Sequence, residues 1–259
     1  MKALALLVAC SLWVSSALAQ DKTEDQIARV MANFEGKSLA DINSALASMR
    51  PKPLNESDKK KLLEDLPLVT AANRISDRKR LEHLVARLQD ALRFHARAGV
   101  VEIIVFNDPR PIVYNKPGVV VVLSTEVLKI VGVDDAALVG VVAHELSHEY
   151  VAMAMLYALR AGDDVRIREL ELFCDAVAVV TLLSLHMNPA SYSEALKRIC
   201  RHSQAAAALN DGSSSHPSLD ARLKLIAALK TLLEPKVDTS IDGAIRRSFA
   251  VAFSHPRMD

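Results

Sequence analysis

Residues 134–159, DDAALVGVVAHELSHEYVAMAMLYAL, place a strong limit on the fold because they are apolar on nearly every side. A helix with this pattern is buried at the centre of a protein. The segment nevertheless carries two histidines and a glutamate in its middle, and unpaired polar groups are costly to bury. We therefore expect a fold built around one central helix whose imidazole and carboxylate groups have a built-in partner, such as a metal ion.

The spacing of these groups indicates how they would be used. His144 and His148 lie four residues apart in an H-E-x-x-H pattern, so on a helix both rings project from one face. Glu145 projects about 100° around the axis from His144, which places it beside a shared ion rather than on it. Two imidazole ligands with a flanking carboxylate are the arrangement that a zinc hydrolase needs.

A catalytic zinc site with two histidines requires a third protein ligand and one open position. The next predicted helix contains RELELFCDAVAVV, in which Arg168, Glu171, Cys174 and Asp175 share a face. Glu171 is the best candidate ligand, and Asp175, one turn later, would accept a hydrogen bond from a ligating histidine. Two alternatives stay open: Glu169 as the ligand, or a surface ion pair between Arg168 and Glu171.

Composition excludes several classes of protein. The chain has 259 residues, a formal charge of +1, 51% hydrophobic residues and 24% charged residues. These values are ordinary for a globular protein and unlike those of disordered or collagen-like chains. The chain lacks the excess of basic residues that would indicate a nucleic-acid partner.

The N-terminus has the features of a secretory signal. MKALALLVACSLWVSSALAQ begins with one lysine, continues with a short apolar stretch and ends in Ala17-Leu18-Ala19, which predicts cleavage after Ala19 and a periplasmic or secreted location. Leu7-Val8-Ala9-Cys10 resembles a bacterial lipobox, so a lipoprotein anchored at Cys10 is the alternative. No later segment is long and apolar enough to predict a membrane span in the mature chain. The remaining cysteines, Cys174 and Cys200, could form a disulfide or stay as buried thiols.

The rest of the pattern predicts an α+β protein that is mostly helical, with a small sheet beside the metal-binding helices. We expect strands at 100–106 and 119–123, and helices at 76–98, 125–131, 134–160, 164–186, 189–208 and 218–233. The predicted divisions are a signal at 1–19, a helical lead and linker at 20–75, the main domain at 76–235 and a C-terminal tail at 236–259.

Three linked motifs then reveal a resemblance. H-E-x-x-H at 144–148, R-x-x-E-x-x-C-D at 168–175 and S-H-P-S-L-D-A-R at 215–222 resemble, in this order, the HtpX/Oma-like zinc metallopeptidases, which are related to the CaaX prenyl endopeptidases. The similarity covers roughly residues 95–230. Two residues depart from the family pattern, because Ser147 stands where Gly or Ala is frequent and Cys174 stands where Ala is usual.

The resemblance implies a zincin-like core and a role for each motif. His144, His148 and Glu171 would bind one zinc ion, Glu145 would be the catalytic base, and Asp175 would support a ligand. His216 would lie on a loop near the metal. Arg222 matches the arginine that follows the third motif in the family.

The expected activity is hydrolysis of peptide bonds in unfolded or damaged proteins of the bacterial envelope, with Glu145 assisting the attack of the zinc-activated water. His216 is our candidate donor to the developing oxyanion, or else a resting-state ligand or a loop histidine without a role. The valines at 119–122 are expected to form an edge strand that pairs with an extended substrate, unless they are an ordinary core strand. The remaining histidines (83, 95, 186, 202 and 255) are expected to be structural or solvated.

A function of a different class stays open. The chain could be a metal-binding scaffold or chaperone of the envelope that does not cleave its partners. The intact Glu145 argues against this reading, since a scaffold needs no general base. A helical interaction module without metal is a third reading, which the three linked motifs disfavour.

Overall fold

The computed structural model describes residues 23–64, 66–202 and 216–234. The predicted signal segment, Cys10, His255 and the predicted tail at 236–259 lie outside these ranges. Residues 23–31 are helical. The further elements, in chain order, are α2 (Leu39–Met49), α3 (Glu56–Glu64), α4 (Arg78–Phe94), β1 (Glu102–Phe106), β2 (Val113–Lys116), β3 (Val120–Ser124), α5 (Thr125–Val131), α6 (Asp135–Ala161), α7 (Asp164–Ser184), α8 (Pro189–His202) and α10 (Leu219–Leu233). The structure is thus mostly helical with a small sheet, as predicted.

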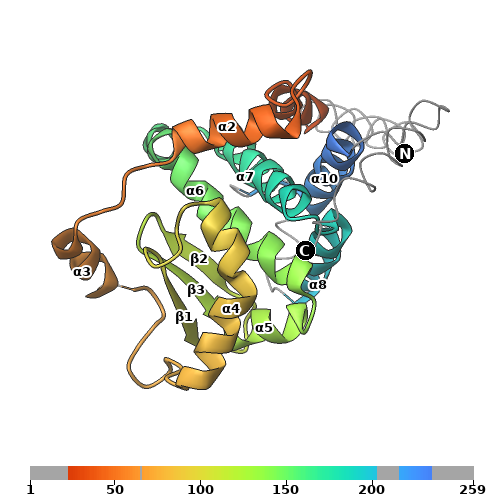
Figure 1. Ribbon diagram of the computed structural model, residues 1–259. Coiled ribbons are helices and arrows are strands. Elements are labelled where there is room, and N and C mark those ends of the chain that lie inside the picture. Colours follow the sequence, from red (N-terminus) through yellow and green to blue (C-terminus); the bar gives the residue numbers. More distant parts are fainter. Residues whose placement is uncertain (1–22, 65, 203–215, 235–259) are drawn as a thin grey trace, which may run out of the picture.

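The sheet has three strands in the order β1-β3-β2 (Figure 1). β1 runs parallel to β3, with Ile104 opposite Val122, whereas β2 pairs with β3 in the antiparallel direction. The valine-rich strand is therefore the central one, and its residues 119–122 are fully buried. The prediction that Val119, Val120, Val121 and Val122 form a substrate-binding edge is wrong. A strand that is apolar without alternation is buried on both faces, and β3 follows that rule.

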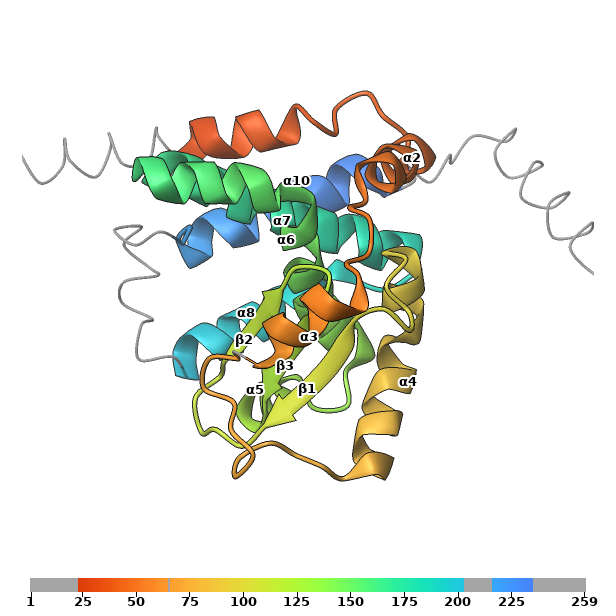
Figure 2. The same cartoon turned by 90° about the vertical axis from the view of Figure 1, so that its left-hand side faces the viewer.

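Alternate residues of the strands enter two different cores. Ile103, Val105, Val121 and Leu123 belong to the main core, which also contains residues of α4, α6 and α7. Ile104, Phe106, Val120 and Val122 face the opposite side, where Leu63, Leu66 and Val69 pack against them. Figure 2 shows α3 lying across this second face of the sheet. The strands thus fix the position of α6 on one side while the linker shields the other side.

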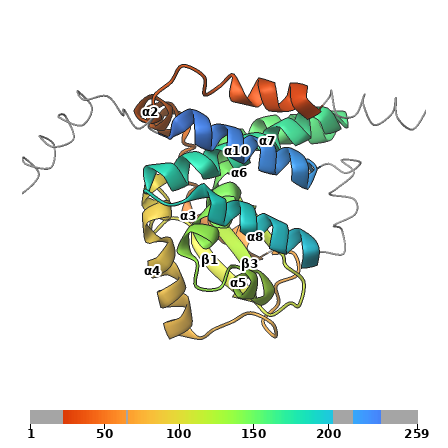
Figure 3. The ribbon, with the colours of Figure 1, turned by 90° about the vertical axis from the view of Figure 1, so that its right-hand side faces the viewer.

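The helices after the sheet pack around α6. α7, α8 and α10 contact one another and form one side of the molecule (Figure 3). α6 contacts α4, α7, α8 and β2, so it is the central helix that its apolar sequence predicts. Of its residues from Ala137 to Ser147, every one is buried.

The N-terminal lead belongs to the same core. Ile27, Val30 and Phe34 are buried in the main cluster, as are Ile42 and Leu46 of α2. Further along, the Ile75 amide donates to the Val105 carbonyl at 2.8 Å, so the linker is tied to β1. Among the helices that the structure describes, none combines the length and the hydropathy that a bilayer crossing requires.

Candidate metal centre

A tight turn between α6 and α7 brings the two halves of the centre together. α6 is capped at its start by Asp134, whose side chain accepts from the Ala137 amide, and at its end by Gly162 in the left-handed conformation (φ 65°, ψ 30°). Asp163 then caps α7 by accepting from the Arg166 amide. Glycine tolerates this conformation without strain, and Asp is a favoured cap. The two helices therefore lie side by side, and residues in the middle of each can meet.

His144, His148 and Glu171 meet at this point. One ligand atom from each residue lies within 4.8 Å of the other two. The Nε2 atoms of His144 and His148 are 3.4 and 3.8 Å from Glu171 carboxylate oxygens. Two donors at zinc–ligand distances of about 2.1 Å and a tetrahedral angle are about 3.4 Å apart, which matches the separation between His144 and Glu171. The three residues together form a group that could hold one metal ion. Two imidazole nitrogens and a carboxylate oxygen are a donor set that zinc accepts.

The outer nitrogen of His144 is held by a charged network. His144 Nδ1 lies 2.8 Å from Asp175 Oδ1, which leaves Nε2 directed at Glu171. Arg222 binds the same carboxylate with two donors, Nη2 at 2.6 Å and Nε at 2.7 Å. The Tyr192 hydroxyl donates to Asp175 Oδ1 at 2.6 Å and accepts from Arg222 Nη2 at 3.1 Å. These bonds orient the His144 ring, which is the usual role of such partners around a metal ligand.

His148 has a different outer partner. Its Nδ1 lies 3.6 Å from the Sγ of Cys174, a thiol that is completely buried. Burial raises the pKa of Cys174 well above its ordinary value, so the partner is a neutral thiol. Since sulfur is a weak acceptor, His148 is held less firmly than His144. Cys174, which departs from the family pattern, therefore contacts a ligand rather than only filling space.

The surroundings shift the pKa values of the two histidines in opposite directions. Burial opposes the charge of His144, yet Asp175 raises its pKa to about 10, while burial lowers the pKa of His148 to about 4. Burial also disfavours ionised Glu171, but its hydrogen bond with His144 brings the pKa down to about 2. Burial likewise opposes ionised Asp175, and Arg222 holds its pKa well below the ordinary range. In the metal-free protein His144 thus carries a proton that metal binding would displace.

Glu145 lies beside the three ligands and is only 7% exposed. Burial raises the pKa of its carboxyl group to about 7, although the charge of His144 opposes the rise. A carboxyl group with a pKa near the working pH can accept and return a proton. The carbonyl of Glu145 accepts a hydrogen bond from the Asn115 side chain, which attaches this turn of α6 to β2.

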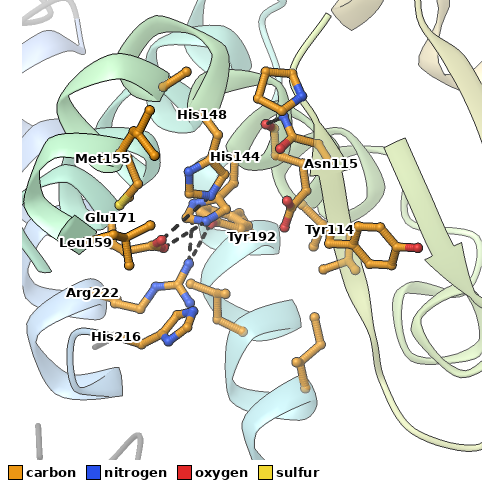
Figure 4. A pocket seen from close by; sticks show the side chains of 18 residues that line it. Tyr114, Asn115, His144, His148, Met155, Leu159, Glu171, Tyr192, His216 and Arg222 are labelled. Carbon is orange, nitrogen blue, oxygen red and sulfur yellow. Dashed lines mark hydrogen bonds and ion pairs between the residues drawn. The ribbon is translucent and has the colours of Figure 1, made fainter. Parts of the chain in front are cut away.

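A cavity of about 540 Å³ opens onto the centre, and its lining includes all three ligands and Glu145. Figure 4 shows Met155 and Leu159 on one side of the ligands and Tyr114 and Asn115 of β2 on the other. His216 is exposed and also lines the cavity, next to Arg222, as the third motif leads one to expect. A cavity of this size is typical of a ligand-binding site.

Other predicted residues lie elsewhere. Glu169 pairs with Arg29 at 2.6 Å and with Arg166 at 3.1 Å, so it is not the third ligand. Cys174 and Cys200 are both free thiols, which decides between the two cysteine states. His83, His186 and His202 are exposed, whereas His95 is buried between Tyr150 and Thr181.

Two residues of the centre were missed by the sequence analysis. Asn115 follows Val113 and Tyr114 and precedes Pro117-Gly118, and this strand-then-turn signal could have revealed β2. Tyr192 has no comparable signal. It reaches Asp175 because Gly140 of α6 leaves room for its ring, and a Cβ at position 140 would lie 2.7 Å from the Cβ of Tyr192.

Comparison with known proteins supplies no further assignment. No family model matches the chain, and no curated protein is significantly similar to it.

Proposed function

We propose that this protein is a zinc-dependent endopeptidase of the HtpX/Oma-like type, with a zincin-like core. The observation that carries the proposal is the convergence of one ligand atom from each of His144, His148 and Glu171 within 4.8 Å, in a cavity that Glu145 also lines. A buried structural ion would need neither the open cavity nor the extra carboxyl group.

His144, His148 and Glu171 would hold the metal. Zinc in this position supplies a Lewis acid that activates water and polarises a carbonyl group. Glu145 accepts a proton from the attacking water and returns it to the leaving amine. His216, at the cavity, is the candidate donor to the oxyanion that develops on the substrate.

Strand β2 is the element best placed to align a substrate. It is one of the two outer strands of the sheet in the part of the chain that the structure describes, and its residues Val113, Tyr114 and Asn115 line the cavity. An extended polypeptide can add to an exposed strand edge through main-chain hydrogen bonds. We therefore assign the substrate strand to β2 rather than to the buried valines of β3.

The proposed substrates are unfolded or damaged proteins of the bacterial cell envelope. The signal-like N-terminus supports that location, with a lipid anchor at Cys10 as the alternative. The outer strand β2 beside the open cavity supports a polypeptide substrate. A strand edge can pair with any extended chain, and an unfolded protein offers many extended segments.

Hydrolysis of casein by the purified mature protein tests the proposal. We expect cleavage that a chelator abolishes and added zinc restores. Glu145→Gln should keep its zinc but lose roughly 100- to 10,000-fold in rate, because it removes a general base and no ligand. A zinc-loaded wild type that cuts nothing would favour the non-cleaving scaffold, and activity that survives Glu145→Gln would refute the role of Glu145.

A further inference from the structure

The helix face that carries His148 continues beyond the metal centre. Ala152, Met155, Leu156 and Leu159 follow at helical spacing, and all four line the same cavity. Figure 4 shows Met155 and Leu159 beside Glu171. The last turns of α6 therefore extend the metal-binding face as an apolar wall.

This wall stays apolar although part of it is exposed to solvent. Leu156 is 38% exposed and Leu159 is 57% exposed. Leu196 and Ile199 of α8 line the same cavity. Large aliphatic side chains that gather in an open cavity typically mark a binding surface.

The charged groups of the cavity belong to the metal centre. Among the described lining residues, the acidic and basic side chains are those of Glu145, Glu171, Arg222 and the histidines 144, 148 and 216, and none of them is part of the apolar wall. Arg222 is moreover engaged by Asp175. The apolar wall thus offers no counter-charge to an acidic or basic substrate side chain. A charged group placed there would lose water without gaining a partner.

We propose that Met155, Leu156 and Leu159 of α6, with Leu196 and Ile199 of α8, form a subsite for a large apolar side chain next to the scissile bond. The inference rests on the proposed peptidase function and gives it a substrate class, namely polypeptide segments with Leu, Ile, Met or Phe beside the bond that is cut. Such segments are buried in folded proteins and become accessible on unfolding.

A matched peptide series tests the subsite. The peptides differ at the two positions that flank one scissile bond, where Leu, Phe, Ala, Asp or Lys is placed in turn. We expect wild-type kcat/KM for Leu or Phe to exceed that for Ala by roughly 10- to 100-fold at one of the two positions, with Asp and Lys lower still.

Two substitutions on the same helix separate the subsite from a general surface effect. Leu159→Gln should reduce the preference for Leu over Ala by roughly 10-fold, because it places a polar group in the wall. Tyr157→Gln should leave the preference unchanged, since Tyr157 is similarly exposed (62%) but is not among the residues that line the cavity. Equal preferences in wild type and Leu159→Gln would overturn the inference.

Binding to the Glu145→Gln variant separates this inference from the proposed function. The same peptides, fluorescently labelled, should bind zinc-loaded Glu145→Gln more tightly when Leu or Phe replaces Ala, and the added change Leu159→Gln should remove that difference. If this occurs while wild type cleaves none of the peptides, the subsite stands and the peptidase proposal fails. Cleavage or binding that is indifferent to Leu, Ala and Asp would overturn the subsite.

Discussion

At the scale of single residues, the two imidazole rings of the candidate metal centre are held by unequal hydrogen-bond partners. His144 faces Asp175, which is itself bound by Arg222 and Tyr192, whereas His148 faces the thiol of Cys174. A firmly oriented ring gains metal affinity, because less freedom is lost when the ion binds. The loss of a single hydrogen bond from the Asp175 network should therefore change zinc affinity more than the same loss elsewhere in the centre.

Tyr192→Phe tests that network. The change removes one donor to Asp175 and one acceptor for Arg222, so we expect zinc affinity to fall by roughly 10-fold. Gly140→Ala should weaken zinc binding as well, because the new Cβ would displace the Tyr192 ring. Both effects can be measured by competition with a chromogenic chelator.

Tyr150→Phe is the matched control for Tyr192→Phe. It also removes a tyrosine hydroxyl, which lies 2.9 Å from His95 Nδ1 in a partly buried position, and no hydrogen bond joins this hydroxyl to His144, His148 or Glu171. Both Phe variants should lose about 1 kcal/mol of folding stability. Equal zinc affinity in the two variants would show that Tyr192 only packs.

At the scale of elements, α6 is also held by a buried ion pair, whose two residues are not among those that line the cavity. Arg97, just after α4, donates to Glu149 of α6 at 2.5 Å, and both side chains are 3% exposed. Arg97 also donates to the Pro51 carbonyl at 2.9 Å, which ties the linker to the same point. Helix α6 is thus connected both to the linker at Pro51 and to the residues just after α4.

Arg97→Met should destabilise the protein by about 3–5 kcal/mol, because it leaves the Glu149 charge buried without a partner. The double variant Arg97→Met/Glu149→Met should recover most of that loss, since it removes both charges. Urea unfolding measures both values. A double variant that is as unstable as the single one would mean that the Pro51 contact, not the ion pair, dominates.

At the scale of the whole molecule, stability should depend on pH through His95. Burial lowers the pKa of His95 from 6.5 to about 3, and the nearby charge of Arg50 adds to this effect. Below pH 6.5, His95 therefore binds a proton in the unfolded chain, whereas in the folded protein it stays neutral until the pH approaches 3. The contribution of His95 to stability is complete above pH 6.5 and is lost as pH falls toward 3.

The difference between wild type and His95→Gln isolates this effect. Between pH 7 and pH 5, wild type should lose about 2 kcal/mol more of its unfolding free energy than the variant does. Other groups that titrate in this range, such as His148 and Glu145, are present in both proteins and cancel in the difference. Parallel pH curves for the two proteins would contradict a neutral buried His95.

Much of this architecture could be predicted from the sequence, because it depends on local signals. The bounds of α6 follow from the cap at Asp134 and the turn at Gly162, and the helical spacing places both histidines on one face. The meeting with Glu171 also follows, since a short turn joins two long helices. These features need only interactions between residues close in the chain.

The parts that could not be predicted depend on contacts between distant segments. β2 lies at the edge and β3 at the centre because the chain inserts β3 between two earlier strands, although the unbroken valine run already favoured a central position. Tyr192 joins the Asp175 network only because α8 packs closely on Gly140. The contact between Tyr192 and Asp175 leaves no motif in the sequence, whereas the valine run and the turn at Pro117-Gly118 are partial signals for the order of the strands.

Zinc binding by two glutamine variants of α7 tests the central claim most directly. Glu171→Gln removes the third ligand, whereas Glu169→Gln, two residues earlier, removes only the partner of Arg29 and Arg166. Isothermal titration should show one zinc ion per chain for wild type and Glu169→Gln, and an affinity at least roughly 10-fold weaker for Glu171→Gln. Unchanged zinc affinity in Glu171→Gln would contradict the metal centre described above.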